Sequence, residues 1–137
     1  TEIGLYALGL QKQIQMDSID GKYRDEAVYA LADSYRYFAK EHPELYKIIM
    51  GIPRVSNAIL EEAAFQIIDP IIQVLSDYDI EKSARMHWQR VLRSIMHGFL
   101  SQEEAGYFSH FNLDPNESYR IAIRCFLDGL HAEEQRS

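Results

Sequence analysis

Apolar residues recur at spacings of three and four along almost the whole chain, and no strand-like alternation continues beyond a few residues. This pattern predicts an all-α fold. We expect six helices with short connections, packed as an orthogonal bundle in a single domain of residues 1–137. The expected helices cover 1–16, 23–40, 43–51, 56–78 and 80–105, and a last one begins at Asp114.

The first two expected helices each show an apolar stripe. In the helix of 23–40 the stripe consists of Val28, Leu31, Ala32, Tyr35, Phe38 and Ala39. In the helix of 1–16 it consists of Ile3, Tyr6, Ala7, Leu10 and Ile14. Such a stripe faces the core in a surface helix, so we expect both sets to be buried.

The helix of 56–78 carries two apolar faces. One is formed by Leu60, Ala63, Ala64, Ile67, Ile71, Val74 and Tyr78, and the other by Phe65, Ile68 and Ile72. The first keeps its phase across Pro70, which predicts one kinked helix in which the carbonyl of Gln66 loses its helical donor. A helix with two apolar faces lies between layers, or packs on one face and lines a cavity with the other.

Residues at the expected helix ends have the chemistry that helix termini need. Pro43 occupies a first helical position, where its missing N–H is not required. We expect Asp79 to cap the helix of 80–105. Asp114, followed by Pro115, begins the last helix as a variant of the capping box.

The charge balance argues against a nucleic-acid surface. The chain has a net charge of −7 and its 14 Lys and Arg residues are scattered, whereas phosphate binding requires clustered cations. No apolar run approaches the roughly 20 residues of a membrane span, and the first residues of the sequence do not show the pattern of a signal peptide. The lone Cys125 has no partner for an intrachain disulfide, which fits a cytoplasmic protein.

The chain gives no positive sign of catalysis. Its five histidines include no pair at the spacing of three or four that converges on a metal ion. Phosphate loops, nucleophile elbows and Cys-based nucleophile motifs are missing. A haem-binding globin-like protein would fit the length, but no proximal-His helix with a matching distal pocket is present. We therefore predict no enzyme, no cofactor and no metal site.

Large side chains are available to line an apolar pocket, since the chain holds nine Tyr, six Phe, four Met and one Trp. Those expected to converge between the helices are Tyr35, Phe38, Tyr46, Met50, Phe65, Ile68 and Trp88. Such a pocket would bind a small, largely apolar or aromatic ligand, which the Tyr hydroxyls would orient. The alternative is that the same side chains form a fully packed core.

A combination of residues within 84–131 points to a known family. In chain order it consists of Trp88, His97, Gly98, Phe99, Gly106, Phe108, Gly129 and Leu130. Together with the helical segments upstream, these residues resemble the WHG-type C-terminal domain of TetR-family transcriptional regulators. The resemblance implies an effector-sensing and dimerising domain whose middle helices enclose a ligand site, and it favours the pocket over the packed core.

In proteins of this family an N-terminal helix-turn-helix binds DNA, and the first helix of the sensing domain links the two parts. The resemblance gives that linking role to residues 1–16 and implies a regulator, most simply a repressor. We expect the helix-turn-helix to have been excised rather than to be naturally absent, so the chain alone should not bind DNA. An alternative from another functional class is a stand-alone dimeric interaction module without a ligand.

Helix geometry places Trp88 and His97 on opposite faces of one helix, since successive residues are about 100° apart. A helix packed on two faces needs two neighbours, and we expect the second to be another subunit; the alternative is an intrachain helix packed on Gly98. The predicted two-fold homodimer uses one face of each of the last two helices. Its residues are Arg93, His97, Leu100, Glu104, Ser118, Ile121, Cys125 and Gly129.

Overall fold

Every regular element in residues 1–136, which the computed structural model describes, is helical. In chain order the elements are α1 (Glu2–Ile19), α2 (Asp25–Glu41), α3 (Pro43–Gly51), η1 (Ile52–Arg54), α4 (Ala58–Phe65), η2 (Gln66–Ile68), α5 (Asp69–Leu75), α6 (Lys82–Glu104), η3 (Tyr107–His110) and α7 (Pro115–Arg136). The six predicted helices are present, the fourth of them divided into α4 and α5, and the all-α fold is confirmed. Within the described range, no helix has the length and apolar character that crossing a membrane requires.

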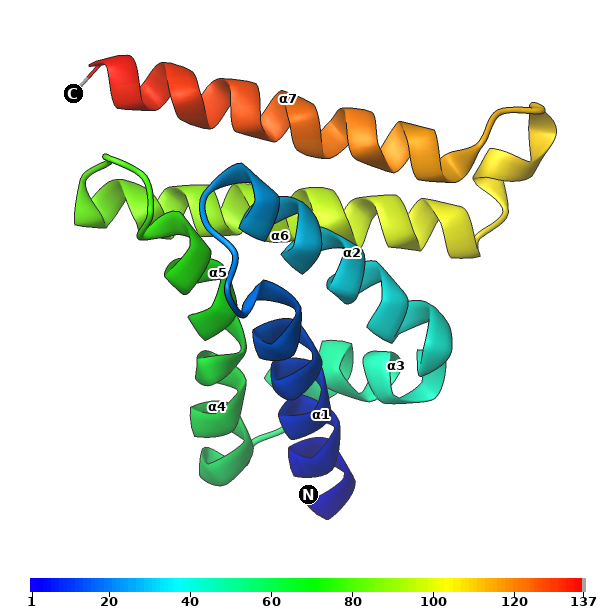
Figure 1. Cartoon of the computed structure of the whole chain (residues 1–137). Coiled ribbons are helices and arrows are strands. Elements are labelled where there is room, and N and C mark those ends of the chain that lie inside the picture. Colours follow the sequence, from blue (N-terminus) through cyan, green and yellow to red (C-terminus); the bar gives the residue numbers. More distant parts are fainter. Residues whose placement is uncertain (137) are drawn as a thin grey trace.

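The helices form two groups that cross steeply (Figure 1). α6 and α7 lie side by side and antiparallel, while α1, α4 and α5 run away from them. α2 lies between the groups and contacts α1, α3, α5, α6 and α7. Most of the largest fully buried side chains come from α2 itself and from α5, α6 and α7, which contact it: Leu31, Tyr35, Phe38, Ile71, Leu75, Leu92, Met96, Tyr119, Ile123 and Leu130.

The predicted stripe of α2 is confirmed. All six of its residues are buried, from Val28 to Ala39. The hydroxyl of Tyr119 in α7 donates to the carbonyl of Ala32 at 2.6 Å. α7 is therefore held on α2 by apolar packing and by a buried hydrogen bond, which satisfies the Tyr119 hydroxyl.

The predicted stripe of α1 is correct for Ala7, which is buried, and for Leu10 and Ile14, which pack partly buried against the core. It is wrong for Ile3 and Tyr6. The buried residues are Gly4, Ala7, Leu8, Gln11, Gln15 and Ile19, whereas Ile3 and Tyr6 are 57% and 62% exposed. Gly4 allows α4 to come close, because a Cβ at this position would lie 2.8 Å from Cδ2 of Leu60. The packed face of α1 thus contains a glycine and two glutamines, which an apolar pattern does not register.

The prediction of one kinked helix over 56–78 is also wrong. α4 ends at Phe65, and α5 begins at Asp69 after the 3-10 turn η2. The N–H of Asp69 donates to the carbonyl of Gln66, which therefore keeps a partner. Pro70 lies in the first turn of α5, where its missing N–H is not needed. A tighter turn thus accommodates the proline without an unsatisfied carbonyl.

The two predicted N-caps differ in outcome. Oδ1 of Asp114 accepts the N–H of Asn116 at 3.0 Å, as a capping residue of α7 does. Asp79 does not lie at the N-cap of α6, because α6 starts two residues later than predicted, with Glu81 before its first residue. The backbone N–H of Asp79 instead donates to Oε2 of Glu134 at 2.8 Å.

Glu134 joins the end of α7 to two loops. The guanidinium of Arg24, in the turn before α2, donates to both Glu134 oxygens at 2.9 and 2.7 Å. Arg24 also lies over the ring of Tyr78, 4.4 Å from its centroid, and adopts a left-handed φ of 55°. The hydrogen bonds from Arg24 lower the pKa of Glu134 from 4.5 to about 2. We call Arg24 and Glu134 the C-terminal clasp.

We expect Glu134→Gln to lower the free energy of unfolding at pH 7 by about 2 kcal/mol, because the charged acceptor of the clasp is lost. A carboxylate with a lowered pKa in the folded state stabilises that state above its unfolded pKa and loses this effect as the pH falls. The difference between the two proteins should therefore shrink as the pH falls from 4.5 towards 2. Urea unfolding at a series of pH values measures it.

Glu133→Gln is the matched control, because Glu133 forms its ion pair within the same helix, with Arg136 three residues away, whose side chain is 69% exposed. Its substitution should change stability by less than about 0.5 kcal/mol. A Glu134→Gln effect that did not depend on pH would contradict the assignment to the clasp.

Candidate functional site

Three adjoining cavities follow one side of α6, with volumes of about 560, 400 and 640 Å³ from its first half to its end. The inner and middle cavities share Gln89, Arg90 and Arg93. The middle and outer cavities share Met50 and His97. Because each cavity shares walls with the next, we treat them as one site and call it the α6 groove.

The inner cavity is mostly apolar and draws its wall from α1, α3, η1, α4, η2 and α6. Its apolar residues are Leu8, Ile49, Ile52, Pro53, Ala64, Phe65, Ile67, Ile68 and Met86. Its volume lies within the roughly 300–1,000 Å³ of small-molecule sites, which are predominantly apolar with a few polar groups. Those polar groups are Glu61 of α4 and Gln89, Arg90 and Arg93 of α6.

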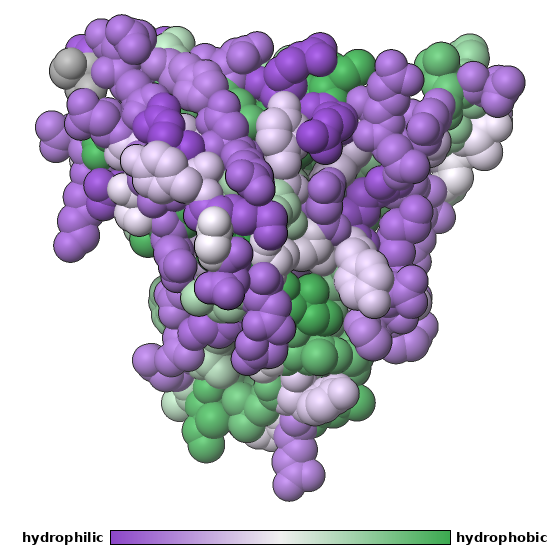
Figure 2. All heavy atoms as spheres, viewed as in Figure 1, coloured by the Kyte–Doolittle hydropathy of each residue, from purple (hydrophilic) through white to green (hydrophobic). Residues whose placement is uncertain are grey.

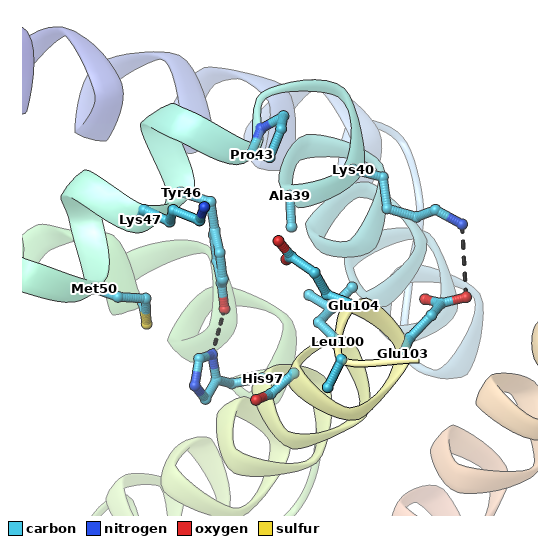
Figure 3. A pocket seen from close by; sticks show the side chains of 12 residues that line it. Ala39, Lys40, Pro43, Tyr46, Lys47, Met50, His97, Leu100, Glu103 and Glu104 are labelled. Carbon is cyan, nitrogen blue, oxygen red and sulfur yellow. Dashed lines mark hydrogen bonds and ion pairs between the residues drawn. The ribbon is translucent and has the colours of Figure 1, made fainter. Parts of the chain in front are cut away.

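The outer cavity, shown in Figure 3, lies between the start of α3 and the end of α6 and carries both signs of charge. Glu103 lies in the wall of the cavity beside Lys40, with its carboxylate 3.6 Å from the ammonium group of Lys40. Arg36 donates to both oxygens of Glu103, at 3.1 and 2.6 Å. These hydrogen bonds lower the pKa of Glu103, so it stays ionised and paired at neutral pH.

A chain of hydrogen bonds crosses the groove between α2, α3 and α6. The hydroxyls of Tyr35 and Tyr46 are 2.6 Å apart, and the Tyr46 hydroxyl is 2.6 Å from Nδ1 of His97. Tyr46 and His97 point towards each other in Figure 3. Burial raises the pKa of both tyrosines, so both hydroxyls remain protonated at neutral pH.

Arg93 acts on one end of this chain. It affects the Tyr35 hydroxyl as a charge and as a hydrogen-bond donor, and a guanidinium has no acceptor. Either hydroxyl can donate in the contact between Tyr35 and Tyr46, and the tautomer of His97 decides whether its Nδ1 donates to Tyr46 or accepts from it. His97 lines both the middle and the outer cavity.

Gln89 supplies an unmet hydrogen-bonding group to the same site. Its side chain is only 6% exposed, and its Oε1 has no hydrogen-bond partner in residues 1–136. A buried polar atom without a partner is costly, so such atoms in native proteins call for a water, an ion or a ligand. Gln89 lines the inner and middle cavities.

Comparison with known proteins now places the chain. The family model for the tetracyclin repressor-like C-terminal domain matches residues 28–126. The chain belongs to this family. It is a C-terminal domain of the TetR type, as the combination of residues around Trp88 and His97 predicted.

A relative and a solved structure agree with this assignment. An uncharacterized HTH-type transcriptional regulator of Mycobacterium tuberculosis is 30% identical over 95 residues, which are 69% of this chain and 44% of the relative. The matched part is thus less than half of that relative's length. A structure of a protein with unknown function from Rhodococcus sp. RHA1 matches 94% of this chain and 70% of its own, with a TM-score of 0.84 and 18% identity. This likeness shows the fold.

The TetR-type domain brings together five of the seven residues predicted to bind a ligand. Tyr35, Tyr46, Met50, Phe65 and Ile68 all line the α6 groove. Phe38 is fully buried and stacks on His42 instead. Trp88 lies against Phe126 of α7, with ring centroids 5.5 Å apart. Trp88 is therefore placed between α6 and α7, outside the groove.

The residues predicted for the dimer contact fall into two sets. Arg93, His97, Leu100 and Glu104 line the α6 groove. Ser118, Ile121 and Cys125 are exposed on α7. Gly129 receives Trp88, whose Cη2 would be 3.3 Å from a Cβ at that position. The prediction thus included four residues of α6 that line the groove. It did not include Gln89, because the amino-acid pattern of a helix does not show that a glutamine is buried.

Removing the hydroxyl of Tyr46, the central member of the hydrogen-bond chain, tests how much this chain contributes to the stability of the fold. Tyr46→Phe keeps the ring but leaves the Tyr35 hydroxyl and Nδ1 of His97 without their shared partner. We expect the free energy of unfolding to fall by about 1–3 kcal/mol, measured by urea unfolding. Tyr37→Phe, at an exposed position of α2, should change stability by less than about 0.5 kcal/mol. Equal effects of the two substitutions would contradict the role of the chain.

Proposed function

We propose that this domain senses a small molecule in the α6 groove and dimerises through α6 and α7, within a transcription regulator of the repressor type. The effector is largely apolar or aromatic, and α1 passes its presence to a helix-turn-helix module. The observation that carries the proposal is the inner cavity, which has the size and lining of a ligand site. Its wall includes Leu8 of α1, so a bound molecule touches the proposed linking helix directly.

The exposed end of α1 supports its proposed role as a link. Figure 2 shows apolar side chains gathered at the end of the molecule where α1 begins and where α4 lies. The exposed apolar residues of these elements and of the loop between η1 and α4 include Ile3, Tyr6, Val55, Ile59 and Phe65. Exposed apolar residues that gather in one patch mark a site of contact with another protein surface. We assign this end to the contact with the DNA-binding module.

Ala64→Trp tests whether effectors bind in the inner cavity, because the larger side chain fills space that Ala64 leaves open. In a thermal-shift screen of apolar and aromatic metabolites, a true effector at 100 times its dissociation constant adds about 2.7 kcal/mol to the stability of the unmodified chain. Ala64→Trp should abolish this gain.

Ala58→Trp is the control, since Ala58 is the exposed first residue of α4, and it should keep the gain. A compound that stabilises both variants equally binds elsewhere. A screen in which no compound stabilises the unmodified chain would favour the ligand-free interaction module.

The proposed dimer face is the side of α6 and α7 that faces away from α2. Val91 of α6 and Ile121 of α7 are 46% and 43% exposed there. Apart from its chain neighbours and the adjacent backbone of α6, a Cβ at Gly98 would have no heavy atom of residues 1–136 within 4 Å, so packing among these residues does not require a glycine here. Glycine costs about 1 kcal/mol relative to alanine inside a helix. Close approach of a partner helix would explain its presence.

Ile121→Glu should convert the dimer into folded monomer, because a two-fold contact brings each substitution in twice. Light scattering measures the mass, and circular dichroism measures the helix content. Gly98→Leu should have the same effect. The added side chain has room in the monomer, but in the proposed dimer it would clash with the helix of the partner. Ile59→Glu, on the exposed surface of α4, should leave the dimer intact. Dimeric Ile121→Glu and Gly98→Leu proteins would show that the subunits meet elsewhere.

A further inference from the structure

We propose that the ligand of the α6 groove is a carboxylic acid with an apolar body, bound as its anion. Its carboxylate binds Arg93 in the middle cavity, and its apolar body fills the inner cavity. This inference rests on the proposed effector-sensing function and names the chemical class of the effector.

The first argument is the unpaired charge of Arg93. Arg24 and Arg36, which are also partly buried, each donate to both oxygens of a carboxylate, Glu134 and Glu103 respectively. None of the ion pairs within residues 1–136 involves Arg93. A partly buried guanidinium without a counter-charge is unfavourable, so the groove is prepared for an anion.

The second argument is the distribution of charge along the groove. The middle cavity is lined by Tyr35, Met50, Gln89, Arg90, Arg93, Ser94 and His97. This lining has two arginines and no acid. The lining of the inner cavity contains the same two arginines and one acid, Glu61. The lining of the outer cavity contains two lysines and two acids, Glu103 and Glu104, so its formal charges cancel. An anion is therefore best placed in the middle cavity.

The third argument is the set of hydrogen-bonding groups around Arg93. The amide of Gln89 is buried with an unpartnered Oε1, and turning the amide by half a rotation presents its N–H₂ instead. His97, whose Nδ1 lies 2.6 Å from the Tyr46 hydroxyl, is a further polar group in the lining of the middle cavity. A guanidinium fork binds a carboxylate through two parallel hydrogen bonds, and Gln89 adds a neutral donor beside it.

The fourth argument is the position of this polar cluster at the mouth of an apolar cavity. Gln89 and Arg93 lie in the wall shared by the middle and inner cavities. A molecule held by its carboxylate at this wall extends into a lining of Ile49, Ile52, Ile67, Ile68 and Met86. Of the two arginines that line this wall, Arg93 is partly buried and Arg90 is exposed. The charge of a monoanion is thus matched better than that of a phosphate dianion.

Matched probes test the class of ligand. Decanoate and 6-phenylhexanoate are compared with the alcohols decan-1-ol and 6-phenylhexan-1-ol, and with decylamine, by isothermal titration calorimetry on the unmodified chain. We expect at least one acid to bind about tenfold or more tightly than its alcohol, and the amine to bind most weakly. Arg93→Gln should weaken binding of the acid about tenfold or more and leave binding of the alcohol unchanged.

Two further variants keep the test sharp. Arg93→Lys keeps the charge but not the fork, so it should bind the acid with intermediate affinity. Arg124→Gln removes a cation from an exposed position of α7 outside the groove and should bind as the unmodified chain does. Circular dichroism confirms that each variant is folded.

The outcomes separate this inference from the proposed function. Acid and alcohol binding alike, with no loss in Arg93→Gln, would overturn the carboxylate while leaving an apolar effector site in place. Preferred binding of the amine would also overturn it. If neither acids nor alcohols bind, both the carboxylate assignment and the α6 groove as the sensing site are overturned.

Discussion

α2 packs against five other helices, and its face from Val28 to Ala39 is almost wholly withdrawn from water. Burying each large apolar side chain of such a face contributes roughly 1.5–3 kcal/mol. Two hydroxyls are buried on this helix, and a buried hydroxyl requires a partner. Ser34 finds one in its own helix, the carbonyl of Leu31. Tyr35 finds one in Tyr46 of α3, and His97 completes the chain from α6. The buried hydroxyl of Tyr35 is therefore tied to both α3 and α6.

The same three side chains lie along the groove beside α6. The rings of Tyr35 and Tyr46 meet edge to face with centroids 5.7 Å apart, and the rings of Tyr46 and His97 are 5.8 Å apart. On one side lies the inner cavity, with its apolar lining, and on the other the outer cavity with paired charges. A purely apolar core at this point would have packed to uniform density. The polar groups at this point hold fixed positions in the groove, where a ligand can form hydrogen bonds with them.

The amino-acid pattern predicted the fold where apolar periodicity and burial coincide. The stripe of α2 and the start of α7 at Asp114 are such cases. The pattern failed where the packed face is not apolar. α1 buries Gln11 and Gln15 and exposes Ile3 and Tyr6, so the periodicity of apolar residues misplaces part of its buried face.

The site was predicted in part for a related reason. Tyr35, Tyr46, Met50, Phe65 and Ile68 come together because helices α2, α3 and α4 surround α6 on one side. Trp88 was placed there because it is large and apolar, but its direction depends on the glycine opposite it in α7, Gly129. Contacts between distant segments of this kind are not encoded in the local spacing of either helix. Gln89 and Arg93 become candidate ligand-binding residues only because the fold places both in the lining of the inner and middle cavities.

α6 connects the two parts of the proposed function, because its opposite faces serve them separately. One face, with Arg93 and His97, forms the wall of the groove, and the other, with Val91 and Gly98, lies on the proposed dimer side. If the dimer fixes α6 and α7 against their copies, a ligand that bridges α6 and Leu8 of α1 acts between a fixed helix and one at the edge of the domain. A molecule that fits one position of α1 better than another shifts the populations of those positions by its difference in affinity, and by no more. The two-fold axis then turns each displacement of α1 into a change in the distance between the two α1 helices, which is the quantity that a pair of DNA-binding modules senses.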